Sequence, residues 1–115
     1  EQSGRSLVVV GSTDMTHYGP RFGFEPQGTG KAAFDWVTKE NDAAAVNALI
    51  AMDETQIIHQ GLSRHNMCCA GAACAAAAAA KKMGAVKGIC LDYASSFDPS
   101  QPSTDFVGYC SVIYG

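Results

Sequence analysis

The sequence predicts an α/β fold in which a central, mostly parallel or mixed sheet is flanked by helices. Three observations favour this class. The stretch SLVVV near the start is a continuous apolar run, typical of a strand that is covered on both faces. The middle of the chain carries helical patterns, and its end carries two strand patterns. At 115 residues, the chain is long enough for one domain and too short for two.

The first strand is expected at residues 7–10, where the β-branched run leaves no polar face. In the stretch GKAAFDWVTKEN, apolar residues then recur at helical spacing between Ala33 and Val37. Asp42 precedes a second apolar period that ends at Ile50. The sequence therefore predicts two short amphipathic helices after the strand.

Two further helices are expected in the second half of the chain. Asp53, with Gln56 three residues later, resembles a capping box and marks the start of a third helix. The stretch AGAACAAAAAAKKMG predicts a fourth, because alanine is the best helix former. Lys81 and Lys82 suit the negative end of its dipole, and Gly84 suits its C-terminal cap. Its small side chains would let this helix lie close against a sheet.

The last part of the chain has the pattern of two strands. GICLDYASS and FVGYCSVIYG are rich in β-branched and aromatic residues, and the turn-rich stretch FDPSQPSTD separates them. The expected order is one strand, four helices and two strands.

Composition narrows the class of function. The chain is 47% hydrophobic and 17% charged, with a formal net charge of −3, whereas nucleic-acid-binding domains are usually basic. It contains no apolar run long enough to span a bilayer and no secretory signal pattern. We therefore expect no nucleic acid and no membrane among its partners, and a cytoplasmic location.

The cysteines indicate reduced thiols. Their number is odd and no C-x-x-C pair occurs, which fits neither a disulfide framework nor a zinc ribbon. The chain also opens on a short stub without an initiator Met, so we expect a fragment of a longer polypeptide. The cysteines are Cys68, Cys69, Cys74, Cys90 and Cys110.

The loop STDMTHYGPRFGF, residues 12–24, is the first candidate site. It follows the expected first strand directly, and ligands of open α/β sheets collect beyond the carboxyl ends of strands. Asp14 and His17 are three residues apart, so the carboxylate could orient the imidazole and raise its basicity, as in general bases. The alternative is a capping aspartate and a surface histidine.

The second candidate is HNMCC, residues 65–69, immediately before the alanine-rich stretch. A cysteine at a helix N-terminus lies near the positive end of the dipole, which favours the thiolate that binds metals or attacks electrophiles. Cys68 is better placed than the other cysteines, although it could equally serve as a small hydrophobe. We assign no role to His59 or His65.

Four motifs, STDMTHYG, NMCCAGAA, LDYASSFD and FVGYCSVIY, stand in this order along the chain. Together they resemble the Memo-like family, which in bacteria and archaea is called AmmeMemoRadiSam system protein B. The resemblance covers nearly the whole chain but only the C-terminal half of a family member. It implies an α/β fold related to the class III extradiol ring-cleaving dioxygenases, with a metal-capable pocket at the sheet edge.

The resemblance also implies roles for individual residues. Cys68 matches a metal-ligand cysteine of the family, and Asp14 and His17 match pocket residues beside the metal, which we expect to act in catalysis. The other two family ligands are histidines of an N-terminal half and have no counterpart here. Glycine is usual where this chain has Cys69, which could offer a competing thiol. A divalent iron, copper or zinc ion would suit such a site.

Three functions follow. The first is a metal-dependent enzyme of the non-haem type, with dioxygenase-like chemistry on a small organic substrate. The alternative is a non-enzymatic module that binds a metal or a partner in an AmmeMemoRadiSam pathway, and the third is a plain scaffold.

The structural expectations are equally specific. Asp14, His17 and Cys68 should converge. Residues 7–10 should be covered by the N-terminal half of the same protein or by another chain. This chain alone should carry no complete metal centre, because only Cys68 matches a family ligand.

Overall fold

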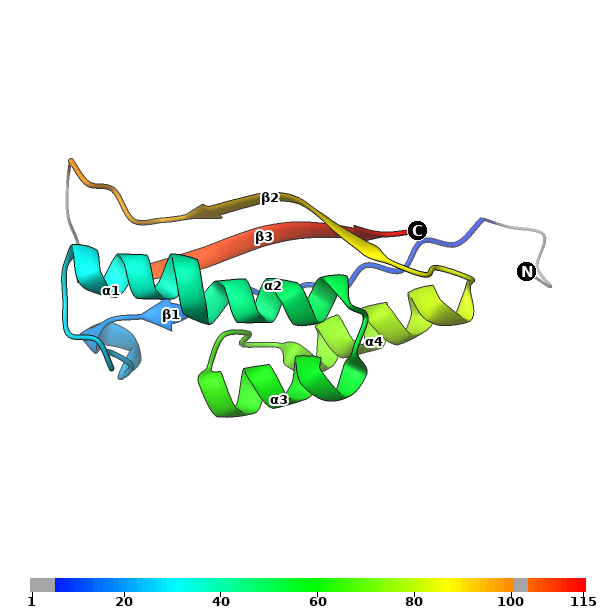
Figure 1. Ribbon diagram of the computed structural model, residues 1–115, viewed down its shortest axis with the longest axis horizontal. Coiled ribbons are helices and arrows are strands. Elements are labelled where there is room, and N and C mark those ends of the chain that lie inside the picture. Colours follow the sequence, from blue (N-terminus) through cyan, green and yellow to red (C-terminus); the bar gives the residue numbers. More distant parts are fainter. Residues whose placement is uncertain (1–5, 101–103) are drawn as a thin grey trace.

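The computed structural model describes residues 6–100 and 104–115. A three-stranded sheet lies along one side of the molecule, and helices cover one of its faces (Figure 1). The strands are β1 (His17–Tyr18), β2 (Gly88–Ser95) and β3 (Phe106–Tyr114), in the spatial order β1-β3-β2. The α/β class predicted from the sequence is thus confirmed.

The expectation of a parallel or mixed sheet is wrong, because both described strand pairs are antiparallel. Strands β2 and β3 follow one another through a short connection, which returns the chain in the opposite direction. Their register runs from Gly88 opposite Tyr114 to Ser95 opposite Gly108. The short β1 joins the other edge of β3, so the loop that was expected to follow a strand itself forms the third strand.

The expected strand at residues 7–10 is also wrong. This segment is irregular and lies beside α4 (Ala70–Lys82) and the C-terminal end of β3 (Figure 1). Its side chains are open, with Val8 83% and Val10 82% exposed. Within the described part of the chain, no strand pairs with it. An apolar run of this kind predicts a buried strand, whereas all four residues of this run are exposed.

The first two expected helices form one continuous run. α1 (Lys31–Trp36) passes through a five-residue π-helical turn, η2 (Val37–Asn41), into α2 (Asp42–Ile50), and the backbone is helical at both junctions. Asp42 is therefore an interior, buried residue and not the start of a new helix. A π turn changes the angular register of the residues that follow, and such turns are frequent at functional sites.

The third and fourth helices are confirmed as α3 (Glu54–Arg64) and α4. The Asp53 side chain caps α3 by accepting a hydrogen bond from the Gln56 N–H at 3.0 Å. Gly84 follows α4 with a φ of 100°, a conformation that favours glycine. α4 packs mainly against α3 and the N-terminal segment, and not against the sheet as expected. A short 3-10 turn, η1 (Pro20–Phe22), completes the described elements.

Two apolar clusters hold these elements together. The first fills the space between the helices and the inner face of the sheet, and it includes Met15, Leu49, Ile57 and Met67. The second is aromatic and surrounds β1, where buried Tyr18 stacks on Phe106 at a centroid distance of 5.3 Å. Both clusters contain a residue of the segment 14–18, so this segment is anchored on either side of the candidate site.

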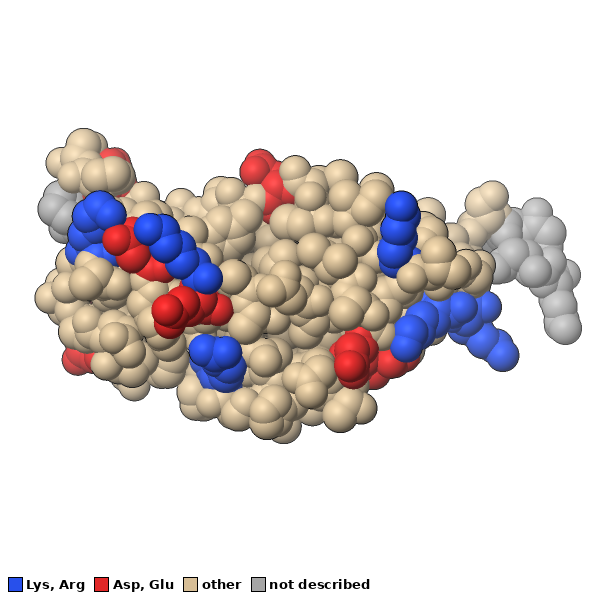
Figure 2. Space-filling view, in the orientation of Figure 1, with Lys and Arg blue, Asp and Glu red and all other residues tan. Residues whose placement is uncertain are grey.

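Charged side chains of both signs are interspersed toward the two ends of the face drawn in Figure 2, and the middle of that face is largely uncharged. Among the described helices, none has both the length and the apolar character needed to cross a membrane.

Gly108 on β3 is the point where the candidate-site segment meets the sheet. The Met15 N–H donates to the Gly108 carbonyl at 2.9 Å, and the Gly108 N–H donates to the Thr16 carbonyl at 3.0 Å. A Cβ at position 108 would overlap the Asp42 carboxylate and crowd the Tyr93 hydroxyl. Position 108 therefore requires a residue without a side chain.

We expect Gly108→Ala to lower the free energy of unfolding by about 2–3 kcal/mol or more, because the added methyl group must displace a buried carboxylate. Gly71→Ala in α4 is the matched control, since no atom lies within 4 Å of the added Cβ. It should raise stability by up to about 1 kcal/mol through helix propensity. Urea unfolding of both variants checks this, and equal effects would contradict the proposed contact.

Candidate metal centre

Two short segments, distant in sequence, are joined by backbone hydrogen bonds. The Cys68 N–H donates to the Asp14 carbonyl at 3.3 Å, and the Cys69 N–H donates to the Thr13 hydroxyl oxygen at 2.9 Å. The strand-like segment before β1 is thus fixed against the turn that leads into α4. The position of Thr13 after the expected first strand nominates it as a site residue, but its contacts with the cysteine turn were not predicted. Its hydroxyl also lies 3.7 Å from the Cys68 sulfur.

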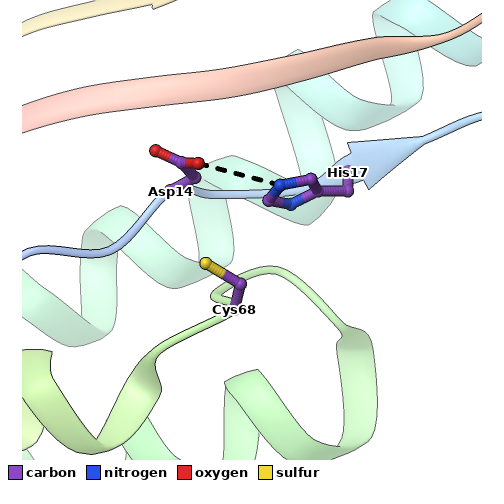
Figure 3. A group of neighbouring side chains, drawn as sticks. All are labelled: Asp14, His17 and Cys68. Atoms are coloured by element: carbon purple, nitrogen blue, oxygen red, sulfur yellow. Dashed lines mark ion pairs between the residues drawn. The ribbon is translucent and has the colours of Figure 1, made fainter. Parts of the chain in front are cut away.

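Asp14, His17 and Cys68 converge, as predicted (Figure 3). Each offers one ligand atom, and these three atoms all lie within 4.8 Å of one another. The side chains of Asp14 and Cys68 are exposed and that of His17 is half-buried, so the group opens to the surface. A carboxylate, an imidazole and a thiol at these separations can hold one metal ion.

The His17 ring is oriented by the backbone and not by Asp14. Its Nδ1 lies 3.2 Å from the Met15 carbonyl oxygen, which can only accept, so Nδ1 carries the hydrogen. The Phe22 ring packs edge-on against the imidazole at a centroid distance of 5.0 Å. The other nitrogen, Nε2, faces the Asp14 Oδ2 at 3.7 Å, too far for a hydrogen bond.

This geometry fits a cation. In the neutral ring the Nε2 of His17 presents a lone pair toward a carboxylate oxygen of Asp14, and two acceptors that face one another are stabilised by a positive charge between or beside them. A proton on Nε2 or a metal ion near the Cys68 sulfur would each supply that charge. The donor set therefore suits both roles expected from the sequence, a metal site and an acid–base pair.

The two adjacent cysteines differ in their surroundings. The sulfur atoms of Cys68 and Cys69 lie 3.9 Å apart. The hydrogen bond with Cys68 and its like charge raise the pKa of the Cys69 thiol. Cys69 is also the residue that directly precedes α4, so Cys68 lies one position outside the helix cap. The expectation that Cys68 sits at the start of a helix is correct to within two residues, since α4 begins at Ala70.

A buried carboxylate, missed in the sequence, supports the site from beneath. Asp42 accepts hydrogen bonds from the Thr16 N–H at 3.0 Å and the Thr16 hydroxyl at 2.5 Å on Oδ1, and from the Tyr93 hydroxyl on Oδ2. Desolvation is the main cause that raises the pKa of Asp42, and burial with the nearby Asp42 raises the pKa of Tyr93. Thr16 stands between Asp14 and His17, so Asp42 fixes the segment that bears both.

Two buried asparagines extend this support to the cysteine turn. The Asn41 Nδ2 donates to the Thr16 hydroxyl oxygen and to the Arg64 carbonyl, both at 3.0 Å. The Asn66 Nδ2 donates to the Asn41 carbonyl and to the Gln60 Oε1, both at 2.9 Å. Asn66 stands two residues before the candidate metal ligand of its turn. A signal was present in the sequence, since Asn41 lies at helical spacing between Val37 and Ala45, which are both buried.

A hollow of about 430 Å³ opens beside the cluster. Its lining includes His17, Cys68 and Cys69, and also Ile58 and Leu62, two apolar side chains of α3. A small organic molecule could therefore lie against the candidate metal centre with an apolar portion on α3.

The chain is similar to proteins of one known family. A family model described as Memo-like protein matches residues 1–113. A MEMO1 family protein of Methanopyrus kandleri is 34% identical over 99% of this chain and 36% of its own length. MEMO1 family proteins of Pyrococcus furiosus and Methanocaldococcus jannaschii are 28% and 30% identical over 98% of this chain, covering 39% and 35% of their lengths. The chain thus spans less than two-fifths of the length of these relatives.

The raised pKa of Asp42 predicts a pH dependence of stability. The folded protein holds the Asp42 proton more tightly than the unfolded chain does. The resulting stabilisation is fully present below about pH 4, the pKa of an unfolded aspartate, and is lost as pH rises through the folded-state pKa. In Asp42→Asn, which keeps an acceptor for Thr16, this loss should disappear, so the variant gains stability relative to the parent as the pH rises above about 4.

Urea unfolding at a series of pH values measures this difference. Asp92→Asn on β2 is the matched control, because Asp92 is exposed. Parallel pH profiles for the parent and Asp42→Asn would contradict a buried, proton-binding carboxylate.

Proposed function

We propose an enzymatic role for this chain, which belongs to the Memo-like protein family. In this proposal the chain supplies the metal-facing part of a non-haem, metal-dependent enzyme that acts on a small organic substrate. The observation that carries this proposal is the convergence of Asp14, His17 and Cys68 beside an open hollow. An imidazole and a carboxylate next to a thiol are the groups that metal-assisted acid–base chemistry needs.

Cys68 is the ligand that we assign to the metal in this chain. Its sulfur is exposed, close to His17 and Asp14, and borne on a turn fixed by hydrogen bonds. A bound iron, copper or zinc ion would supply Lewis acidity to a coordinated substrate. We propose that further ligands come from another part of the protein, in line with the greater length of its relatives.

His17 and Asp14 are the groups that we assign to proton transfer. The Met15 carbonyl fixes the His17 ring through Nδ1, which leaves Nε2 to take or give a proton in the hollow. Asp14 places a carboxylate oxygen 3.7 Å from Nε2, beside the nitrogen that we assign to proton transfer. Phe22 and the neighbouring backbone limit rotation of the ring, so the reactive nitrogen keeps one direction.

A second candidate function is a non-enzymatic module that binds a metal or a partner. The observation that favours it is the amount of open apolar surface. The outer face of the sheet exposes Ile89, Leu91, Tyr109 and Ile113, with Leu91 58% exposed. A separate hollow of about 640 Å³ lies between the segment 7–11, α4 and the end of β3. We propose that a further part of the protein, or another chain, covers these surfaces.

Substitutions in the purified protein separate the proposed roles. We expect Cys68→Ser to weaken binding of the metal by more than about tenfold, because a thiolate ligand is lost. We expect His17→Gln and Asp14→Asn to keep the metal and to lower turnover by about 10²–10⁴-fold, the usual contribution of general acid–base catalysis. Metal content and turnover, measured on one preparation, check both statements.

Cys90→Ser on β2 is the matched control, since it removes a thiol outside the cluster. Loss of the metal from His17→Gln would make His17 a ligand and not a proton-transfer group. Full metal content in Cys68→Ser would contradict the assigned metal site.

A separate experiment tests the proposal that a further part of the protein, or another chain, covers the apolar surfaces. The 115-residue chain expressed alone should self-associate and give a weak near-ultraviolet circular dichroism signal, because its exposed apolar faces pair with one another. Leu91→Glu on the outer sheet face should reduce this association. Analytical ultracentrifugation measures it, and a sharp monomer with a native-like tertiary signal would show that no cover is needed.

A further inference from the structure

We infer that Cys69 supplies a second sulfur ligand to the metal held by Cys68, so that this chain alone contributes two thiolates and favours a thiophilic d¹⁰ cation, zinc or cuprous copper, over ferrous iron. This inference rests on the proposed function, since it requires a metal at Cys68. It adds a ligand at the position where the family resemblance would place glycine, and it names the class of cation.

The separation of the two sulfur atoms carries the inference. They lie 3.9 Å apart. Two thiolates bound at about 2.3 Å to one tetrahedral ion are separated by about 3.8 Å, the length of one edge of the tetrahedron. Cys68 and Cys69 therefore hold their sulfur atoms at the spacing that a single zinc ion would impose.

The turn that bears Cys68 and Cys69 is held by hydrogen bonds of its backbone and not by its two thiol groups. Both backbone N–H groups are taken up by the segment of Thr13 and Asp14. Cys69 precedes α4, yet its side chain makes no capping hydrogen bond. Both thiols are exposed, and both line the hollow of about 430 Å³ together with His17. The two sulfur atoms are therefore accessible from the same space, which has room for an ion.

An alternative use of two adjacent cysteines, a disulfide, fits this turn poorly. The peptide bonds of the described residues are all trans, which places neighbouring Cα atoms about 3.8 Å apart. Disulfides span Cα distances of about 4.4–6.8 Å, so a bond between Cys68 and Cys69 would be strained and easily reduced. Binding of one soft cation uses both thiols without that strain.

X-ray absorption spectroscopy counts the sulfur ligands directly. The purified protein is loaded anaerobically with one equivalent of zinc, and the zinc edge is measured. We expect two sulfur scatterers in the parent, one in Cys69→Ser and two in the control Cys90→Ser. Competition with a chelator should show that Cys69→Ser binds zinc at least about tenfold more weakly, with a smaller loss for ferrous iron, because a hydroxyl replaces a soft donor.

Cys69→Gly gives the same sulfur count by an independent route if the serine variant does not fold, which far-ultraviolet circular dichroism reports. One sulfur scatterer in the parent would overturn the inference and leave the proposed metal site intact. Two sulfurs retained in both Cys69 variants would also overturn it, since another cysteine would then be the second ligand. Failure of the parent to bind zinc, iron or copper would overturn the inference and the proposed function together.

Discussion

The buried carboxylate of Asp42 is the constraint on which the rest of the site depends. A charge removed from water must be matched by hydrogen bonds, and Asp42 obtains them from Thr16 and Tyr93. Its burial also requires that β3 carry no side chain at Gly108, where the segment of Thr16 pairs with the sheet. One carboxylate thus ties together the helical run, the sheet and the segment that bears Asp14 and His17.

A few hydrogen bonds connect Asp42 to the rest of the candidate site. Asn41 and Asn66 carry the hydrogen-bond network from Thr16 to the turn of Cys68. The donors therefore stand at the exposed rim of a buried polar network, each on a segment whose backbone is already held. Such support is what a metal or catalytic site needs, because small errors in donor position cost affinity and rate. The rim is exposed and the outer sheet face is apolar and open, and both features agree with our proposal that further parts of the protein complete the site.

The sequence predicted what depends on local signals. The Asp53 cap, the alanine-rich run and the two C-terminal strand patterns all act within a few residues, and each was confirmed. It did not predict the Asp42 network, whose hydrogen bonds join residues 26 and 51 positions apart. Nor did it predict the pairing of β1 with β3, in which His17 lies opposite the distant Val107, or the π turn of η2. The run at residues 7–10 was misread because a buried strand and an apolar segment without cover have the same composition. The convergence of Asp14, His17 and Cys68 could be expected from their resemblance to a family pattern, whereas the orientation of His17 by the Met15 carbonyl could not.

The central claim is that the donors form a preorganised metal site held by the Asp42 network. Anomalous diffraction from crystals of the metal-loaded protein tests it most directly. We expect one anomalous peak within about 2.0–2.3 Å of the Cys68 sulfur, on the side that faces His17 and Asp14, with the hydrogen bonds from Thr16 to Asp42 retained. A peak away from Cys68, or a metal-bound structure in which Thr16 has left Asp42, would contradict it.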